Sequence, residues 1–187
     1  MKLELNRFLR GMHGVLDDVV YKRFEDGTIS MGKPKKFEGP PTAAQLRVRT
    51  RFTEAASYAT AVLADPDRRD VYITAAKEMG RNSVQSVAMA DYLNLPRVHE
   101  IDLVFYNGHV GDPIWIIASD DFEVVTVKVR IKDANGTVLE EGLATKTDVR
   151  WVYLGKTNVP RDQNLLIEAE AADRAGHDTA LSEIWHA

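Results

Sequence analysis

The sequence predicts an α+β protein built in three parts. An N-terminal β-hairpin arm with its linker (residues 1–41) precedes a small helical unit (42–96) and a C-terminal, seven-stranded antiparallel β-sandwich (97–187). Three observations support this prediction. An Asp-Gly turn separates two strand-like runs in the first part, apolar residues recur at helical spacing in the second, and apolar and polar residues alternate in the third. Prolines mark both boundaries.

Residues 19–31 predict the hairpin. Val19, Tyr21 and Phe24 lie in one run of strand-forming residues, and Ile29 and Met31 lie in the next. Asp-Gly between the runs is a strong turn signal because both turn residues take positive φ. A lone two-stranded hairpin is marginally stable in water. These five side chains therefore need a covering surface, which is either the helices of the same chain or a sheet edge of a second copy.

Three helices are predicted in the second part. Thr42-x-x-Gln45 has the spacing of a capping box, Asp65-Pro66 ends the first helix and begins the second, and Ser83 begins the third. Leu95-Pro96 ends the helical region. Apolar residues at helical spacing predict the buried side of the first helix: Leu46, Phe52, Ala55, Ala56, Ala59, Val62 and Leu63.

The third part predicts about seven short strands. The clearest is residues 125–132, which are apolar at Val125, Val127, Val129 and Ile131 and polar between them. This alternation predicts an antiparallel strand with one buried face and one wet face. Seven strands in about 90 residues match the size of an Ig-type sandwich.

Part of this region resembles a bacterial Ig-like or fibronectin-III-like module. The resemblance covers residues 111–182 and is carried by Gly111-Asp112-Pro113, by residues 119–136 and by Ala169 to Gly176, where His177 replaces the usual asparagine. The resemblance implies a non-catalytic spacer, adhesin or assembly unit. The whole chain is similar to uncharacterised bacterial proteins with a glycine-flanked hairpin, a helical pair and an Ig-like end.

Composition excludes several classes of protein. The 187 residues are 44% hydrophobic and 28% charged, as in soluble globular proteins. The absence of cysteine excludes disulfides, thiol catalysis and Cys-ligated metals. No apolar run reaches the ~18 residues of a membrane span. Glu4, Arg7 and Arg10 interrupt the N-terminus, so we expect no standard signal peptide; the cytoplasm, a virion and an unconventional export route stay open.

We expect no enzyme activity. The sequence contains no nucleophile elbow, zincin, P-loop or dinucleotide-binding motif. Ser119-Asp120-Asp121 places a hydroxyl beside carboxylates, but in a turn, where these residue types serve turn hydrogen bonds. The five histidines do not lie at metal-ligand spacing: His13, His99, His109, His177 and His186.

The sequence predicts no cofactor, with a Ca²⁺ site as the alternative. Asp112, Asp120, Asp121 and Asp173 belong to inter-strand turns, and turns at one end of a sandwich lie close together. Carboxylate oxygens suit Ca²⁺. Of these, Asp112, Asp121 and Asp173 are the candidate ligands; turn-stabilising, solvated carboxylates are the other interpretation.

Charge divides the chain into a basic front and an acidic back. Residues 1–60 carry 11 Lys/Arg and 7 Asp/Glu, whereas residues 97–187 carry 9 and 16. The basic residues Lys33, Lys35, Lys36, Arg47, Arg49 and Arg51, with Tyr21 and Phe37 nearby, are the candidate nucleic-acid contacts. The cluster is small and diluted by acids, so we expect a solvated helix face or a patch that meets an acidic partner instead. Opposite charges on the two ends favour head-to-tail contact between copies.

The leading hypothesis is a structural subunit that self-assembles into a filament or a virion-type assembly. Its contacts would be Val19, Tyr21, Phe24, Ile29 and Met31 of the arm and a sheet edge of the sandwich, because unpaired edges accept strands. The alternative is a monomeric adhesion or ligand-binding module that uses the sandwich loops around Asp121 and Asp173.

Overall fold

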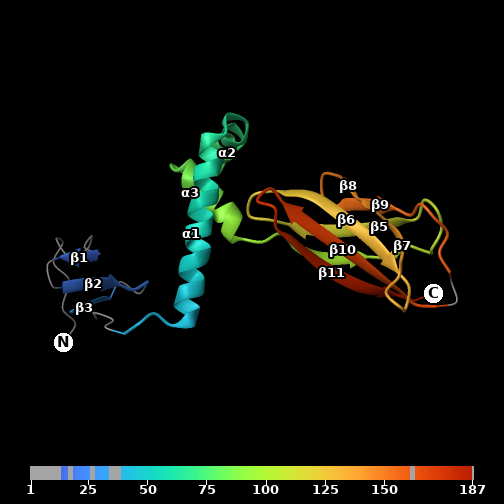
Figure 1. The fold of residues 1–187 in the computed structure, drawn as a ribbon, viewed down its shortest axis with the longest axis horizontal. Coiled ribbons are helices and arrows are strands. Elements are labelled where there is room, and N and C mark those ends of the chain that lie inside the picture. Colours follow the sequence, from blue (N-terminus) through green and yellow to red (C-terminus); the bar gives the residue numbers. More distant parts are fainter. Residues whose placement is uncertain (1–13, 17–18, 26–27, 34–38, 161–162, 187) are drawn as a thin grey trace. The chain divides into compact units, whose positions relative to one another are not determined.

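The chain has the predicted α+β composition. A computed structural model describes residues 14–16, 19–25, 28–33, 39–160 and 163–186, which contain three helices and three antiparallel sheets (Figure 1). The chain divides into two compact units, Met1–Thr42 and Ala43–Ala187. Within the described residues, no helix combines the length and the apolarity that crossing a membrane requires.

The first unit holds a sheet in the order β1-β2-β3, formed by Gly14–Leu16, Val19–Arg23 and Ile29–Gly32. The antiparallel β2–β3 pair confirms the predicted hairpin strands, with Tyr21 opposite Met31. The Asp26-Gly27 turn lies outside the described residues. The two-stranded prediction was incomplete, because β1 adds a third strand by pairing Leu16 with Val19.

The helices of the second unit begin and end close to the predicted positions. They are α1 (Ala43–Ala64), α2 (Pro66–Glu78) and α3 (Val84–Leu93). Asp65 Oδ1 accepts from the Asp67 N–H at 3.1 Å, and Ser83 Oγ accepts from the Ser86 N–H at 3.2 Å. Both side chains therefore satisfy free N–H groups at a helix start, as N-cap residues do.

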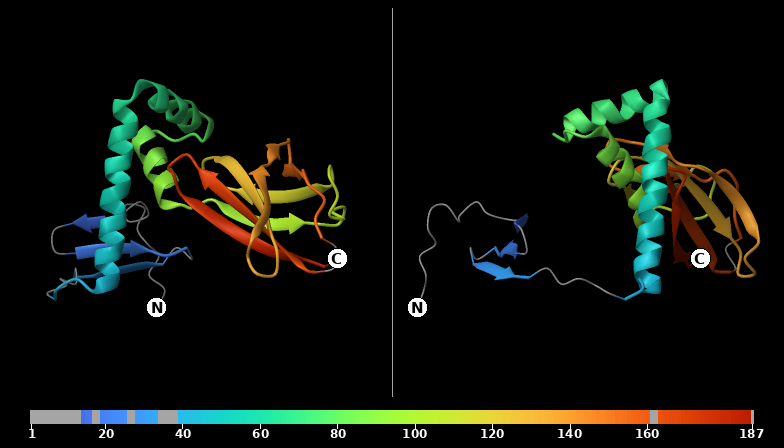
Figure 2. Two further views of the ribbon diagram at one scale, coloured as in Figure 1. Left: turned by 45° about the vertical axis from the view of Figure 1, so that its right-hand side comes forward. Right: turned by 60° about the vertical axis from the view of Figure 1, so that its left-hand side comes forward.

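The buried side of α1 is shorter than its apolar pattern predicts. Ala55, Ala59 and Val62 are fully buried, but Leu46 and Phe52 are 50% and 58% exposed. The reason is length, since α1 has 22 residues and α3 has ten. Figures 1 and 2 show the N-terminal end of α1 extending past α2 and α3.

Two four-stranded antiparallel sheets form the rest of the second unit. One has the order β4-β5-β9-β8, from strands Arg97–Asp102, Pro113–Ser119, Trp151–Leu154 and Thr145–Lys146. The other has the order β11-β10-β6-β7, from Asp178–Trp185, Leu165–Asp173, Val124–Lys132 and Val138–Leu143. Their inner faces share one hydrophobic core, an arrangement consistent with a β-sandwich.

Two details of this region differ from the predictions. The described residues form eight strands and not seven, because Thr145–Lys146 pairs with β9 as a separate short strand. Val125 was expected on the buried face, but it is 42% exposed and Val124 is buried. A register shift between Ala172 and Asp173 of β10 reverses the alternation at this end of β6.

Aromatic contacts join the helices to the sheets within the second unit. Phe122, in the β5–β6 turn, packs against the helical core and stacks on Tyr72 of α2 with ring centroids 4.5 Å apart. Tyr92 of α3 meets the His177 ring edge-on at 4.7 Å. The end of the two sheets that carries the β5–β6 and β10–β11 turns therefore lies against the helices.

Candidate functional site

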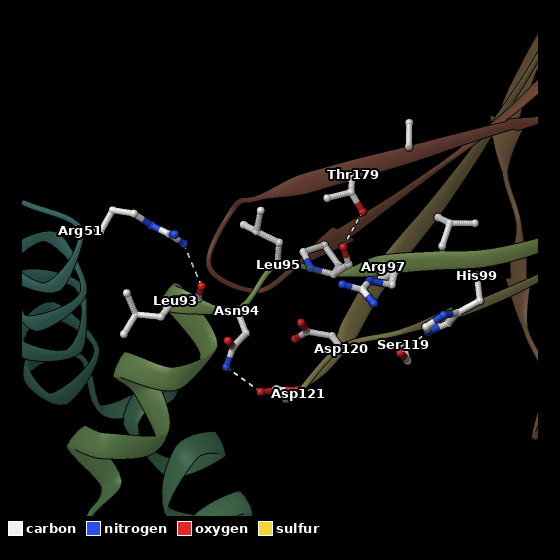
Figure 3. Close-up of a pocket in the computed structure, with 13 residues that line it drawn as sticks. Arg51, Leu93, Asn94, Leu95, Arg97, His99, Ser119, Asp120, Asp121 and Thr179 are labelled. Atoms are coloured by element: carbon white, nitrogen blue, oxygen red, sulfur yellow. Dashed lines mark hydrogen bonds between the residues drawn. The ribbon is translucent and has the colours of Figure 1, made fainter. Parts of the chain in front are cut away.

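A cleft opens where the helices of the second unit meet its sheets. It has a volume of about 660 Å³ and is lined by the end of α3, the start of β4, the β5–β6 turn and the start of β11. Figure 3 shows its polar side chains, which include three basic groups (Arg51, Arg97 and His99) and two carboxylates (Asp120 and Asp121). A volume of this size is typical of a small-molecule site.

Hydrogen bonds fix the two walls of this cleft. Arg51 Nη2 donates to the Leu93 carbonyl at 2.9 Å, and Asn94 Nδ2 donates to Asp121 Oδ2 at 2.5 Å. The second bond joins the end of α3 to the β5–β6 turn. The positions of α3 and of the β5–β6 turn are therefore coupled through the cleft.

The cleft contains a serine beside a histidine. His99 Nε2 lies 2.6 Å from Ser119 Oγ. Oδ2 of the neighbouring Asp120 accepts from the backbone N–H groups of Phe122 and Glu123 at 3.1 Å, and its Oδ1 is buried without a hydrogen bond. Asp120 thus has the turn-stabilising role expected from the sequence. A nucleophilic serine needs a base that is itself oriented by a third group.

A buried carboxylate lies next to a second hollow of about 270 Å³. Asp91 is 1% exposed, and its Oδ2 accepts from the hydroxyls of Tyr72 and Tyr58, whereas Oδ1 is buried without a hydrogen bond. Burial raises the pKa of Asp91 above its usual range, against the opposing effect of the tyrosine hydrogen bonds. A buried carboxylate of this kind is costly to ionise.

Glu140 of β7 is a second buried carboxylate, but its pKa shifts in the opposite direction from that of Asp91. Its carboxylate accepts from the Tyr153 hydroxyl and the Lys156 N–H, each at 2.6 Å, and from the Thr157 N–H and hydroxyl at 3.0 and 2.6 Å. Burial alone would raise the pKa of Glu140, but these bonds outweigh it and hold the pKa below the usual range. Glu140 is thus a structural anchor for the segment after β9.

The predicted calcium ligands separate into two groups. Asp112 precedes β5 and Asp121 follows it, so the length of this strand lies between them. Asp112 Oδ2 accepts from the Asn107 and His109 N–H groups, and Asp173 accepts from the His177 N–H and lies 3.1 Å from His177 Nδ1. No three His, Asp or Glu side chains in the described part of the chain are grouped to hold a metal ion. The Ca²⁺ hypothesis stays a prediction.

The predicted assembly residues lie on β2, on β3 and between these strands. Val19, Tyr21 and Ile29 are half-buried, whereas Phe24 and Met31 are 50% and 65% exposed. Of the predicted nucleic-acid contacts, Arg47, Arg49 and Arg51 lie on α1. Lys35, Lys36 and Phe37 lie outside the described residues.

Sequence reasoning missed an apolar surface on the outer face of the β4-β5-β9-β8 sheet. Trp115 and Ile117 point outward from β5, with Val152 and Leu154 beside them on β9. The signal was present, because β5 is apolar at outward as well as inward positions. The cleft had no such signal, since its residues are scattered from position 51 to position 180.

Comparisons with known proteins do not assign a family. No protein-family model matches the chain, and no curated protein matches it. An engineered protein of known crystal structure is similar over 48% of this chain and 19% of its own length, with 19% identity and a TM-score of 0.32. A conjugative transposon lipoprotein from Bacteroides eggerthii is similar over 50% of this chain and 97% of its own, with 12% identity and a TM-score of 0.25.

Proposed function

We propose that this chain is a non-catalytic structural subunit that self-assembles through its N-terminal sheet and an edge of an Ig-like sandwich. The strand orders support the Ig-like interpretation. Lettered in chain order, β4-β5-β9-β8 corresponds to the A-B-E-D sheet of Ig folds, and β11-β10-β6 corresponds to G-F-C, with β7 as an added C′ strand. Modules of this type serve as repeating units because their edges remain open.

The exposure of apolar side chains at two strand surfaces is the observation that carries the proposal. Phe24 and Met31 are half or more exposed in the first unit. β7 pairs with β6 on one side only and exposes Val138, Leu139 and Leu143 by 45%, 37% and 64%. An edge strand with exposed apolar residues favours pairing with another chain, and the N-terminal sheet supplies strands for it.

Deletion of residues 1–40 tests this proposal. Light scattering and negative-stain microscopy over a dilution series should show polymers of the full chain and none of the deletion variant. Thermal unfolding should show that the second unit stays folded. Particles unchanged by the deletion would contradict the arm contact.

A charge on the acceptor edge is the second arm of the test. Leu139→Lys should weaken assembly because a lysine on an edge strand opposes strand addition. Ile184→Lys is the matched control, since Ile184 is 52% exposed on the opposite edge strand, β11. Equal effects of the two substitutions would argue against β7 as the acceptor.

The cleft beside Asp121 favours a second candidate, a monomeric ligand-binding or adhesion module. Its size suits a small ligand, and the β5–β6 turn that lines it is one of the sandwich loops. This candidate predicts a monomer at every concentration and a melting temperature that rises with Ca²⁺ or a glycan. If neither Ca²⁺ nor a glycan raises the melting temperature and the chain forms concentration-dependent polymers, this candidate is rejected.

A further inference from the structure

The cleft between the helices and the sheets of the second unit is lined by charges of both signs that do not pair with one another. Its basic groups are Arg51, Arg97 and His99, and its acidic groups are Asp120 and Asp121 (Figure 3). Elsewhere in the second unit opposite charges pair directly, as they do on the outer face of β6 and β10. The unpaired charges of the cleft are therefore available to a ligand.

Two of the basic groups lie together on β4. Arg97 pairs with Ser119 in the β4–β5 register, so both side chains project from one face of the sheet. The register shift just before Glu100 makes His99 an extra residue, and its Nε2 lies 2.6 Å from Ser119 Oγ. Glu100 itself lies opposite Ile117 and does not line the cleft.

The Arg97 guanidinium has no hydrogen bond or ion pair with another described residue. Its planar fork of N–H donors matches the two oxygens of a carboxylate. The Ser119 hydroxyl and the His99 ring lie next to it and supply further polar contacts. This side of the cleft therefore suits a carboxylate.

The two acidic groups lie on the β5–β6 turn. Asn94 Nδ2 donates to Oδ2 of Asp121, which leaves Oδ1 for another donor. Asp120 uses Oδ2 for two backbone N–H groups, and its Oδ1 is buried without a hydrogen bond. An ammonium group carries three donors and no acceptor, so it satisfies oxygens of this kind. This side of the cleft therefore suits an amine.

The cleft also has an apolar wall. Leu93 and Leu95 line it at the end of α3 and in the segment that leads to β4, and Leu95 is 50% exposed. Arg51 lies beside this wall and donates to the Leu93 carbonyl at 2.9 Å. The volume of about 660 Å³ is that of a site for a drug-sized molecule and not for a single ion.

A ligand of one charge fits this lining less well. An anion would lie near Asp120 and Asp121, and a cation would lie near Arg97 and His99, so each would meet repulsion from like charges. A ligand that carries both charges at its two ends avoids this conflict.

We propose that the cleft binds a short peptide with free termini, which places its carboxylate at Arg97 and Ser119 and its ammonium group at Asp120 and Asp121. An apolar side chain of the peptide lies against Leu95. The inference goes beyond the proposed self-assembly and does not require it. It uses the cleft of the second candidate function, but it names a different class of ligand.

Isothermal titration calorimetry of the full chain tests the proposal. The probes are a dipeptide of two leucines, its N-acetylated form, its C-terminal amide and free leucine. The dipeptide should bind, and each blocked form should bind about tenfold or more weakly, because it lacks one of the two charges. Absence of dipeptide binding at millimolar concentration would overturn the proposal. Equal binding of free leucine would identify an amino acid as the ligand and reject the peptide.

Two substitutions assign the ends of the ligand. Arg97→Gln should weaken binding of the dipeptide about tenfold and leave binding of the amide unchanged. Asp121→Asn should weaken binding of the dipeptide and leave binding of the N-acetylated form unchanged, and its amide oxygen can still accept from Asn94. A variant that weakens every probe equally would show that the residue only shapes the cleft, which would overturn its assigned contact.

Arg47→Gln and Asp148→Asn are the matched controls, because both residues are exposed and neither lines the cleft. Both should leave binding unchanged, and thermal unfolding checks that all the variants stay folded. A loss equal to that of the cleft variants would show a general effect of net charge. Inorganic phosphate or Ca²⁺ that binds as tightly as the dipeptide would identify a site for one charge only. Either result would overturn the proposal.

The outcomes separate this inference from the proposed function. Polymers that bind no dipeptide would reject the peptide site and leave self-assembly standing. A chain that binds the dipeptide but stays monomeric at every concentration would do the reverse. Hydrogen exchange locates the ligand, because the dipeptide should slow exchange at the end of α3 and in the β5–β6 turn. Slower exchange only in other elements would reject the cleft as the site.

Discussion

At the scale of single residues, two buried carboxylates show how hydrogen-bond partners decide the effect of burial. Glu140 has donors on both oxygens, and its pKa lies below the usual range. Asp91 has donors on one oxygen only, and its pKa lies above the usual range. Ionisation therefore favours the fold at one site and opposes it at the other.

Glu140→Gln should destabilise the protein most at neutral pH. The pKa of Glu140 is lower in the folded chain, so its contribution is present above the unfolded-state pKa of about 4.3 and is lost as pH falls through the folded-state pKa. We expect a loss of roughly 3 kcal/mol at pH 7 from the disrupted donors. Urea unfolding at several pH values checks this. A difference from the wild type that is constant with pH would contradict it.

Asp91→Asn should change the pH dependence in the opposite direction. The raised pKa of Asp91 contributes stability that is present below the unfolded-state pKa of about 3.9 and lost as pH rises through the folded-state pKa. The asparagine side chain in the variant does not ionise, so the variant does not lose this stability as pH rises. The free energy of unfolding of the variant minus that of the wild type should therefore increase with pH. The same urea series measures it. A relative stability that falls with pH would refute the assignment.

At the scale of elements, the turn after β4 depends on a glycine. Gly108 has φ of +79°, and a Cβ there would lie 2.9 Å from Val159 Cγ2 and 3.2 Å from Trp185 Cη2. The positive φ costs an L-residue about 1–2 kcal/mol, and overpacking adds a similar amount. The turn therefore needs glycine for its backbone and for its space.

Gly108→Ala should destabilise the protein by roughly 3 kcal/mol. Gly136→Ala is the matched control, because Gly136 has φ of +83° with nothing within 4 Å of the added Cβ. The control should lose only the backbone part, about 1–2 kcal/mol. Denaturant unfolding of both variants gives the comparison. Equal losses would show that the packing against Val159 and Trp185 is not tight.

Short sequence signals predicted the helices and strands better than they predicted the clefts and exposed faces that form when these elements pack together. The capping residues Asp65 and Ser83 begin their helices as expected, because capping depends on neighbouring backbone groups. The prediction that Val125 is buried was wrong because the pairing of β6 with β10 shifts register there: Ala172 pairs with Thr126 and Asp173 pairs with Val124, which leaves Val125 as an extra residue in β6. The cleft was not predicted, since Arg51, Asn94 and Asp121 meet only after the helices pack against the sheets.

At the scale of the whole molecule, one aromatic side chain connects the helices to the sheets. Phe122 lies in a turn of the sheets but packs in the helical core and stacks on Tyr72. Its contacts therefore couple the unfolding of the helices to that of the sheets.

Phe122→Ala should uncouple the unfolding of the helices from the unfolding of the sheets. We expect a loss of about 3 kcal/mol and earlier hydrogen exchange in α2 and α3 than in β6 and β10. Phe105→Ala is the control, because Phe105 is 55% exposed and lies away from the helices. Uniform acceleration of exchange across helices and sheets would show that the coupling does not pass through Phe122.

The ion pairs across β6 and β10 have a consequence for growth. Arg130 pairs with Glu168 and Glu170, and Lys132 pairs with Glu168, so these charges neutralise one another on the outer face of the two strands. A subunit that joins others through one arm and one sheet edge has a valence of two, and linkage through that contact alone extends as an unbranched line or closes on itself. Lateral association of such lines through the outer face of β6 and β10 would have to break the ion pairs, so growth should stay unbranched.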